Sequence, residues 1–328
     1  MRPVVLALAE QKVPVTVLNH GVLAQGLPSS IPIVDADAPY GSVCFGTSLT
    51  DTIPLVVARS ARKQGKPTLA ILDNWLNYRS RLATDGLGPF IPDIYAVMDQ
   101  KAKDEAIADH IPSECLVVTG HPNLASLSTD VERATPQWRH SLRQSLGLGL
   151  NGRALIAYVN EPVTNDQGDG PENPLWRGYT EVDALAALAA GLGSTAVDVA
   201  IIPHPRDDAA QVAGIWETVR GDCSGAVITG YSGRDIVLAS DRVAGMASIL
   251  LYESWLIGRP TISLQPGLVR DDLLSIASRP GIVLARTQTT QAVQKWLQLE
   301  NKPVHPDLAL HAVAAQTIAA LLRFDIGQ

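Results

Sequence analysis

Short apolar runs alternate with longer helix-like segments along the whole chain. In the first half, runs rich in β-branched residues fall at 15–18, 31–34, 42–45, 68–72, 94–97 and 116–119. In the second half they fall at 154–158, 197–202, 226–229, 243–246, 261–264 and 282–284. Continuously apolar strands joined by helices are typical of parallel sheets that are covered on both faces. The pattern therefore predicts an α/β protein built from βα units.

The strands form two sets, and a polar, helix-rich stretch at 124–153 separates them. A chain of 328 residues is a little longer than two typical domains, so each half can bury a core of its own. We expect Rossmann-like parallel-sheet domains at 1–150 and 151–328. A last helix is expected to begin at Pro306 and run to about Leu322; whether it returns to the N-terminal domain is left open.

Two further segments stand out. The polar stretch 161–178 is too long for a routine connection and predicts a flap over a site. The chain begins in a predicted helix, 2–12, with no strand ahead of it. We therefore expect the first strand of the N-terminal domain to be missing, either because the domain is trimmed or because the native start lies upstream.

Composition excludes several classes of protein. The net charge of −7 provides no basic surplus for a nucleic acid, so any bound phosphate must be held locally. Three widely spaced cysteines suggest neither a disulfide framework nor a metal site. No leader-like pattern and no apolar run of about 18 residues occur, which predicts a cytoplasmic protein without a transmembrane segment and leaves peripheral membrane contact open.

The strand at 197–202 leads directly into His204, Pro205 and Arg206. Proline ends the strand and fixes the loop, so both cationic side chains are expected at the carboxyl edge of the sheet, where open α/β sheets bind ligands. We expect His204 and Arg206 to contact a phosphate, with His204 donating a hydrogen bond or proton as the phosphate leaves. The alternative is a packed histidine and a solvated arginine.

A turn of Gly245, Met246, Ala247 and Ser248 follows the strand at 243–246 and opens a helix. Such a helix start presents free N–H groups and can bind an anion, although many turns of this type bind nothing.

Glu253, inside the same apolar helix, needs a partner: either ribose hydroxyls or a buried arginine such as Arg259. Tyr231, in a loop after a strand, is expected to touch the base, and Asn160, just past the strand at 154–158, is placed with the donor-binding residues.

The N-terminal half carries a parallel set of strand-end residues. Asp73 follows the strand at 68–72 and is the candidate general base, with helix capping as the alternative. The residues expected to shape an acceptor pocket are Ser48, Asp51, Asn74, Tyr78, Arg79 and His121. His121 could equally form a simple capping turn before Pro122. No phosphate-loop, metalloprotease, hydrolase-elbow or paired-cysteine motif occurs, so we expect neither a metal nor a resident cofactor.

With these residues in view, the chain resembles the GT-B superfamily, whose members have two Rossmann-like domains facing one another across a cleft. His204-Pro205 resembles the HP motif of bacterial sialyltransferases, polysialyltransferases and teichoic-acid glycerophosphotransferases. The stretch through Ser248 resembles their serine-containing phosphate loop. The resemblance implies that His204 and Ser248 bind a donor phosphate.

The non-hydrolysing UDP-N-acetylglucosamine 2-epimerases share this frame. The segment VVTGHPNLASL and the segment IIPHPR are similar to theirs, whereas Met246-Ala247-Ser248 and Tyr252-Glu253 stand where they have Ser-Gly-Gly and Glu-Glu. Our main hypothesis is an inverting, metal-independent transferase that moves a sugar or related group from a nucleotide donor to a hydroxyl acceptor. Asp73 is its base, and His204 stabilises the leaving phosphate. The alternatives are an epimerase and a degenerate, non-catalytic GT-B protein.

Overall fold

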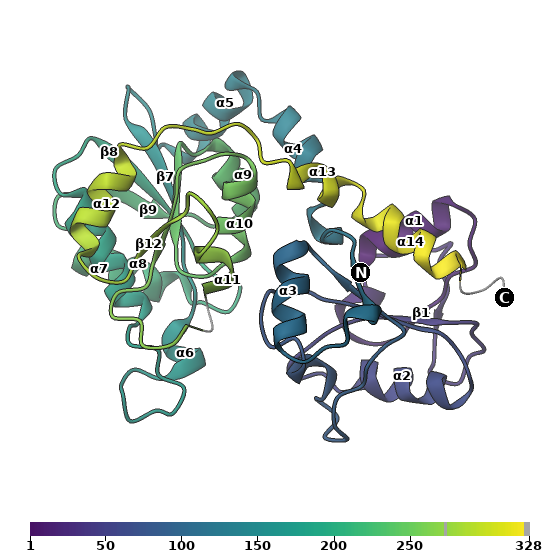
Figure 1. The fold of residues 1–328 in the computed structure, drawn as a ribbon. Coiled ribbons are helices and arrows are strands. Elements are labelled where there is room, and N and C mark those ends of the chain that lie inside the picture. The colour runs from purple at the N-terminus through teal and green to yellow at the C-terminus, as the bar shows by residue number, and fades with distance from the viewer. Residues whose placement is uncertain (272–273, 325–328) are drawn as a thin grey trace. The chain divides into compact units, whose positions relative to one another are not determined.

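The computed structural model describes residues 1–271 and 274–324 of the chain. They form two compact units (Figure 1). The first unit joins Met1–Ser128 to the C-terminal segment that begins at Pro306, and the second unit is Thr129–His305. The chain thus changes unit at residues 128 and 129, whereas the sequence placed a boundary near 150.

The first unit has a four-stranded parallel sheet in the order β3-β4-β5-β6 and a separate parallel pair, β1-β2. Its strands are β1 Val17–Leu18, β2 Ile33–Val34, β3 Val43–Gly46, β4 Thr68–Ile71, β5 Ile94–Val97 and β6 Leu116–Val118. Its helices include α1 Arg2–Glu10, α2 Ile53–Lys63, α3 Gln100–Ala108, α13 Asp307–Ala312 and α14 Ala314–Phe324. Short 3-10 turns are η1 Gly21–Ala24, η2 Ser80–Leu82, η3 Ser113–Cys115 and η4 Pro122–Leu124.

The two ends of the chain share one core. In Figure 1 the yellow α14 lies beside the purple α1, and both pack on the sheet. Ala315, Ile318, Ala319 and Leu322 recur at helical spacing and form the buried face of α14. The long final helix expected from Pro306 is therefore present as two helices, which Val313 separates.

Gly120 lets the C-terminal segment approach the loop after β6. Its φ is +85°, and a Cβ there would lie 2.6 Å from the carbonyl oxygen of Leu310, so only glycine fits. The next main-chain N–H, from His121, donates to Nδ1 of His311 at 2.9 Å. One glycine and one hydrogen bond thus fix α13 on this loop.

The second unit has a six-stranded parallel sheet in the order β12-β11-β10-β7-β8-β9. Its strands are β7 Ala154–Val159, β8 Val197–Ile202, β9 Ser224–Val227, β10 Arg242–Gly245, β11 Thr261–Leu264 and β12 Val283–Ala285. Its helices are α5 Pro136–Leu146, α6 Val163–Gln167, α7 Glu181–Leu192, α8 Ala209–Val219, α9 Gly233–Ala239, α10 Ile249–Leu256, α11 Leu274–Ala277 and α12 Thr289–Leu297. Helix α4, Leu127–Arg133, spans the change of unit.

The strand order of this sheet reverses between β7 and β10. From β7 the chain adds β8 and β9 on one side, and then β10, β11 and β12 on the other. The loops that leave β7 and β10 therefore diverge and make a switch point, which is the preferred ligand position in open α/β sheets. The fold alone directs attention to residues 160–161 and 246–248.

Each predicted strand overlaps an observed one, and all strand pairs are parallel, so the α/β prediction is confirmed. The boundaries move by at most two residues, as at β9, which begins two residues earlier than predicted because Ser224 and Gly225 pair with β8.

Residues 136–146 belong to the second unit because α5 packs on α9. Arg139 and Arg143 of α5 pair with Asp241 at 3.1 and 2.8 Å. The expected flap contains the short helix α6, and Gln167 within it is buried and donates to the carbonyl of Tyr179 at 2.8 Å. Within the described ranges, no helix combines the length and the apolar character needed to cross a bilayer.

Candidate functional site

Four loops meet at the carboxyl edge of the second sheet, on neighbouring strands. Asn160 and Glu161 follow β7, His204 follows β8, the turn at 246–248 follows β10, and Gln265 follows β11. The main-chain N–H of Asn160 donates to the carbonyl of Ile202 at 2.9 Å, which joins the first two loops. The sequence-predicted donor residues of these loops therefore share one edge.

His204 is held as a neutral hydrogen-bond donor. Its main-chain N–H donates to Asp207 Oδ2 at 2.7 Å, and its ring Nδ1 accepts from the main-chain N–H of Arg206 at 3.1 Å. A neutral ring that accepts at Nδ1 carries its proton on Nε2. Burial, followed by the charge of Arg206, lowers the pKa of His204. The ring can therefore offer an Nε2–H to a ligand oxygen at neutral pH.

Arg206 is not an isolated cation. Its guanidinium makes a bidentate pair with Asp166 of α6, with N–O distances of 2.6 and 2.8 Å. Both side chains are more than half exposed, so the pair is solvated and weak. A ligand phosphate would have to share Arg206 with this carboxylate.

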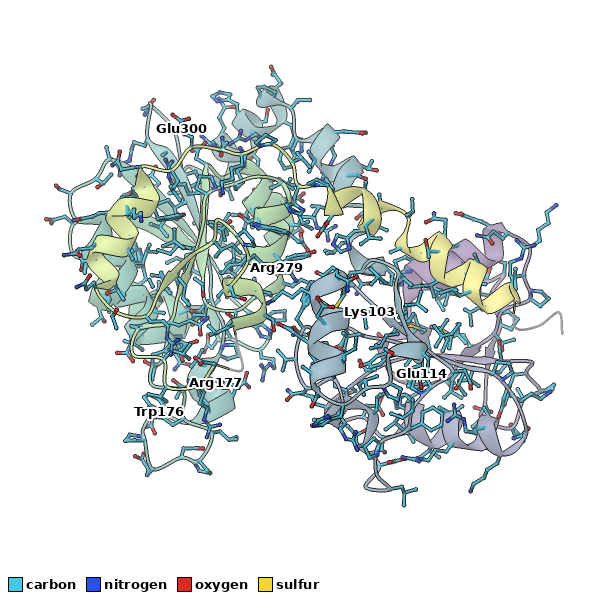
Figure 2. The ribbon with its side chains drawn as sticks, in the orientation of Figure 1. Lys103, Glu114, Trp176, Arg177, Arg279 and Glu300 are labelled. Carbon is cyan, nitrogen blue, oxygen red and sulfur yellow. The ribbon has the colours of Figure 1, made fainter. Side chains whose placement is uncertain are left out.

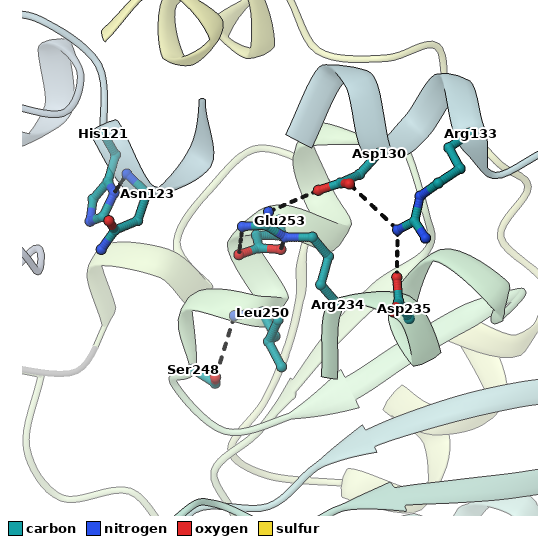
Figure 3. A network of polar contacts seen from close by, with 9 residues as sticks. All are labelled: His121, Asn123, Asp130, Arg133, Arg234, Asp235, Ser248, Leu250 and Glu253. Carbon is teal, nitrogen blue, oxygen red and sulfur yellow. Dashed lines mark hydrogen bonds and ion pairs between the residues drawn. The ribbon is translucent and has the colours of Figure 1, made fainter. Parts of the chain in front are cut away.

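The turn after β10 has the geometry of a helix start. Ser248 caps α10, and its Oγ accepts from the main-chain N–H of Leu250 at 3.3 Å (Figure 3). Gly245 is required by close packing, because a Cβ there would lie 2.7 Å from Leu251 Cδ1 and 3.0 Å from the carbonyl oxygen of Val159. Met246 is buried in the core.

The N–H groups of this turn are not free, contrary to the sequence-based expectation. Glu161 Oε2 accepts from the main-chain N–H of Ala247 at 2.6 Å, and the N–H groups of Met246 and Ser248 also stabilise the carboxylate. The reason is the strand order: β7 and β10 are neighbours, so the second residue of the loop after β7, Glu161, reaches the turn after β10. Burial nevertheless raises the pKa of Glu161 to about 7.

Two buried amide oxygens flank this turn without a hydrogen-bond partner among the described residues. Asn160 is 2% exposed; its Nδ2 donates to Asp207 at 2.8 Å, but its Oδ1 is unsatisfied. Gln265 donates to Ser263 Oγ at 2.9 Å, and its Oε1 is also unsatisfied. Because buried polar atoms without partners are rare, these two acceptors mark an edge with unused hydrogen-bonding capacity.

Glu253 has an arginine partner, which is Arg234 and not Arg259. Arg234 of α9 donates to both Glu253 oxygens, from Nε at 2.7 Å and from Nη2 at 3.0 Å (Figure 3). Asp130 takes the remaining side of that guanidinium at 3.0 Å. Glu253 is 4% exposed, so the pair is a buried tie between α9 and α10. Its ribose-binding role stays a prediction, as does base contact by Tyr231, which is 44% exposed.

In the first unit, Asp73 lies at the carboxyl end of β4 and does not cap a helix. Arg81 Nη1 and Thr47 Oγ1 donate to its Oδ1, at 2.5 and 2.9 Å. Arg81 is buried, whereas Asp73 is 52% exposed, and Oδ2 has no partner in the described part of the chain. The carboxylate is therefore oriented through one oxygen and presents the other to solvent.

His121 is brought close to Asp73. It is buried after β6, and Trp75 stacks beside it with ring centroids 6.4 Å apart. Its Nδ1 accepts from the main-chain N–H of Asn123, and its Nε2 lies 3.3 Å from the carbonyl oxygen of Asp73. Since the ring contacts the Asp73 main chain, its observed role is to support the loop that carries the carboxylate.

The other acceptor-side residues serve local structure. Tyr78 is buried and its hydroxyl donates to Glu105 of α3 at 2.5 Å; burial first, and then Glu105, raise its pKa strongly. Arg79 donates to the carbonyl of His110 at 3.2 Å. These two residues are thus tied to α3 and its C-terminal loop and do not join Asp73.

The remaining three acceptor-side residues, Ser48, Asp51 and Asn74, make hydrogen bonds within local turns. Ser48 Oγ accepts from two N–H groups of its own loop, and Asp51 begins α2 by accepting from the N–H of Ile53 at 3.1 Å. Asp51 also bonds His20 at 2.7 Å. Asn74 accepts from the next N–H along the chain.

Solved structures with the same arrangement of elements share little sequence with this chain. A UDP-GlcNAc 2-epimerase from Methanocaldococcus jannaschii matches with a TM-score of 0.62 at 11% identity, over 98% of this chain and 95% of its own. An MnaA–UDP complex from S. aureus matches with a TM-score of 0.61 at 12% identity, over 99% and 92%. The fold is that of the GT-B superfamily.

A third GT-B structure, UDP-GlcNAc 2-epimerase from Neisseria meningitidis bound to UDP-GlcNAc, matches with a TM-score of 0.55 at 15% identity. It covers 86% of this chain and 76% of its own. No protein-family model matches the sequence, and a search of curated proteins finds no match. The two Rossmann-like units of the GT-B fold are therefore recognised through structure.

Proposed function

We propose that this chain is an enzyme that binds a nucleotide-activated sugar at the carboxyl edge of its second sheet. The observation that carries the proposal is His204, fixed with its proton on Nε2, at the same edge as the N-terminal turn of α10. An N–H donor beside a helix N-terminus suits a phosphate oxygen. Support comes also from GT-B neighbours that were solved with UDP or UDP-GlcNAc.

The reaction we propose first is transfer of the sugar to a hydroxyl acceptor. Asp73 Oδ2 takes the acceptor proton as the acceptor oxygen attacks the anomeric carbon. The bond from that carbon to the phosphate oxygen breaks, and the phosphate leaves with the electron pair. His204 donates a hydrogen bond to the oxygen on which the charge develops, and the N–H groups of the α10 turn and Arg206 stabilise the same charge without a metal.

An epimerase is the second candidate, and the whole-chain likeness to 2-epimerases favours it. The two candidates differ in the atom that loses a proton. An epimerase exchanges hydrogen at C2 of the sugar, so incubation with UDP-GlcNAc in deuterated water and no acceptor would place deuterium there. A transferase would leave C2 unlabelled.

The first experiment is a thermal-shift scan with UDP, CDP, CMP and GDP. A ligand at about a hundred times its Kd adds about 2.7 kcal/mol to the stability of the folded state. Stabilisation by at least one nucleotide is expected, and none at any concentration would contradict the proposal. Binding without transfer or exchange on any tested donor would instead indicate the non-catalytic GT-B alternative.

A further inference from the structure

Glu161 holds the position that a ligand phosphate would take. It is the second residue past β7, and its Oε2 lies 2.6 Å from the main-chain N of Ala247, inside the turn that opens α10. The distance is short for an N–H···O bond, as expected when the acceptor is charged. The chain therefore supplies its own anion to its own helix N-terminus.

A carboxylate and a phosphate oxygen compete for such a turn. Each needs the same N–H groups of residues 246–248. Two negative charges in contact also repel one another strongly where water is excluded. A phosphate can enter only if the side chain leaves, or if the side chain loses its charge. The identity of residue 161 thus controls the affinity of the turn for phosphate.

We propose that Glu161 is a built-in competitor of the ligand phosphate at the α10 turn, and that a nucleotide diphosphate binds there with uptake of a proton by this side chain or with its displacement. The inference rests on the proposed function, because it assumes that the second unit binds a nucleotide. It adds a residue that sets the affinity and its dependence on pH.

The surroundings of Glu161 leave its charge weakly compensated. In residues 1–271 and 274–324, no lysine, arginine or histidine forms an ion pair with it. The titratable groups that act on it include Asp166 of α6 and the buried hydroxyl of Tyr158, which belongs to β7. Two arginines, Arg206 and Arg177, act on Asp166; Arg206 is paired with it, and His204 is neutral. Only the N–H groups of the turn stabilise the ionised form.

The direction of the pH effect follows from this balance. Burial raises the pKa of Glu161 to about 7, so the protonated form is populated below neutral pH. A ligand that prefers the protonated form binds with constant affinity there and loses affinity as pH rises through that pKa. For a single group with this pKa, the apparent Kd rises about tenfold between about pH 6 and about pH 8.

Isothermal titration calorimetry with UDP-GlcNAc tests the proposal. Each phosphate of this probe carries one ester and one anhydride bond and has no second acidic proton, so the ligand itself does not titrate near neutral pH. The proteins are the wild type, Glu161→Gln and a control, Glu300→Gln, which removes one exposed glutamate of the same unit. Figure 2 places Glu300 at the opposite end of that unit from Trp176, which lies in the loop between α6 and α7.

Wild type and Glu300→Gln should weaken about tenfold from about pH 6 to about pH 8, while Glu161→Gln keeps its affinity. At the higher pH, Glu161→Gln should therefore bind about tenfold more tightly than the wild type. Glu161→Ala provides a second variant with the same expected gain, and circular dichroism of each variant reports its fold.

Three results would overturn the proposal, and they are distinguishable. Equal affinity of wild type, Glu161→Gln and Glu161→Ala at both pH values would rule out the competition while leaving nucleotide binding intact. Weaker binding by both folded Glu161 variants would make this side chain a ligand contact and not a competitor. Absence of binding by every protein at both pH values would contradict the proposed function, and this inference would fail with it.

Discussion

Two carboxylates, one at the carboxyl edge of each sheet, follow the end of a strand but have opposite settings. In the first unit, Asp73 is exposed and its charge is balanced by the buried Arg81. In the second unit, Glu161 sits against main-chain N–H groups and has no cation beside it among the described residues. The first arrangement leaves a charged oxygen exposed. In the second, the side chain changes its charge near neutral pH, because burial raises its pKa to about 7. In the function proposed above, the first edge abstracts a proton and the second binds the phosphate.

The largest effect is expected at the first edge. Asp73→Asn keeps the shape of the side chain and its contacts with Arg81 and Thr47 but removes the base, so kcat should fall by roughly 10²–10⁴. Nucleotide affinity should not change, because the proposed phosphate contacts, His204 and the α10 turn, are left intact. Asp37→Asn, an exposed aspartate of the same unit, is the matched control. Full activity of Asp73→Asn would show that this edge does not supply the base.

The contrast between a paired and an unpaired carboxylate can be measured within the second unit. Glu253→Gln breaks the buried pair with Arg234, and the free energy of unfolding should fall by about 3 kcal/mol. Urea denaturation gives this value, and Glu300→Gln should change it little. An unchanged midpoint for Glu253→Gln would mean that α9 and α10 do not depend on the pair.

The next prediction concerns the contact between His204 and the ligand phosphate at the second edge. His204→Ala removes a hydrogen bond to a charged oxygen, which is worth about 1.5–3 kcal/mol, so UDP affinity should drop by roughly tenfold to hundredfold. Calorimetry measures the change. Retained affinity would separate the His-Pro turn from the phosphate and would limit its role to holding the loop after β8.

The smallest effect is expected at the exposed pair of Asp166 and Arg206. Asp166→Asn should change the free energy of unfolding by less than about 1 kcal/mol, because exposed pairs are weak. It should also raise UDP affinity, since Arg206 is released and one negative charge beside Glu161 is removed. Weaker UDP binding by this variant would place Asp166 among the ligand contacts.

The sequence predicted the strands well because their signal is local. A run such as Val197–Ile202 is buried at every position and is apolar at all but Asp198, so it can be recognised from the sequence alone. The same logic located His204 and the Gly245 turn at a sheet edge. The break between α13 and α14 at Val313 was not predicted, because the apolar spacing continues through this residue although the helix ends before it.

The partners of the site residues were harder to predict, since strand order decides them. Nothing along the chain indicates that β7 lies beside β10, and this neighbourhood alone brings Glu161 to Ala247. Likewise Glu253 signalled a need for a partner, but only the packing of α9 on α10 selects Arg234. One signal for Glu161 was available: it is an acidic residue two positions past the strand that lies at the switch point.

The packing of the C-terminal helices on the first unit has a consequence for the order in which the protein folds during synthesis. The second unit is continuous in sequence and can fold as soon as His305 has left the ribosome. The first unit needs α14 against α1, a contact between segments about 300 residues apart, so its core stays open until α14 has been synthesised. Contacts of such high sequence separation form late and slowly. The nascent N-terminal half is therefore the part that would most need a chaperone.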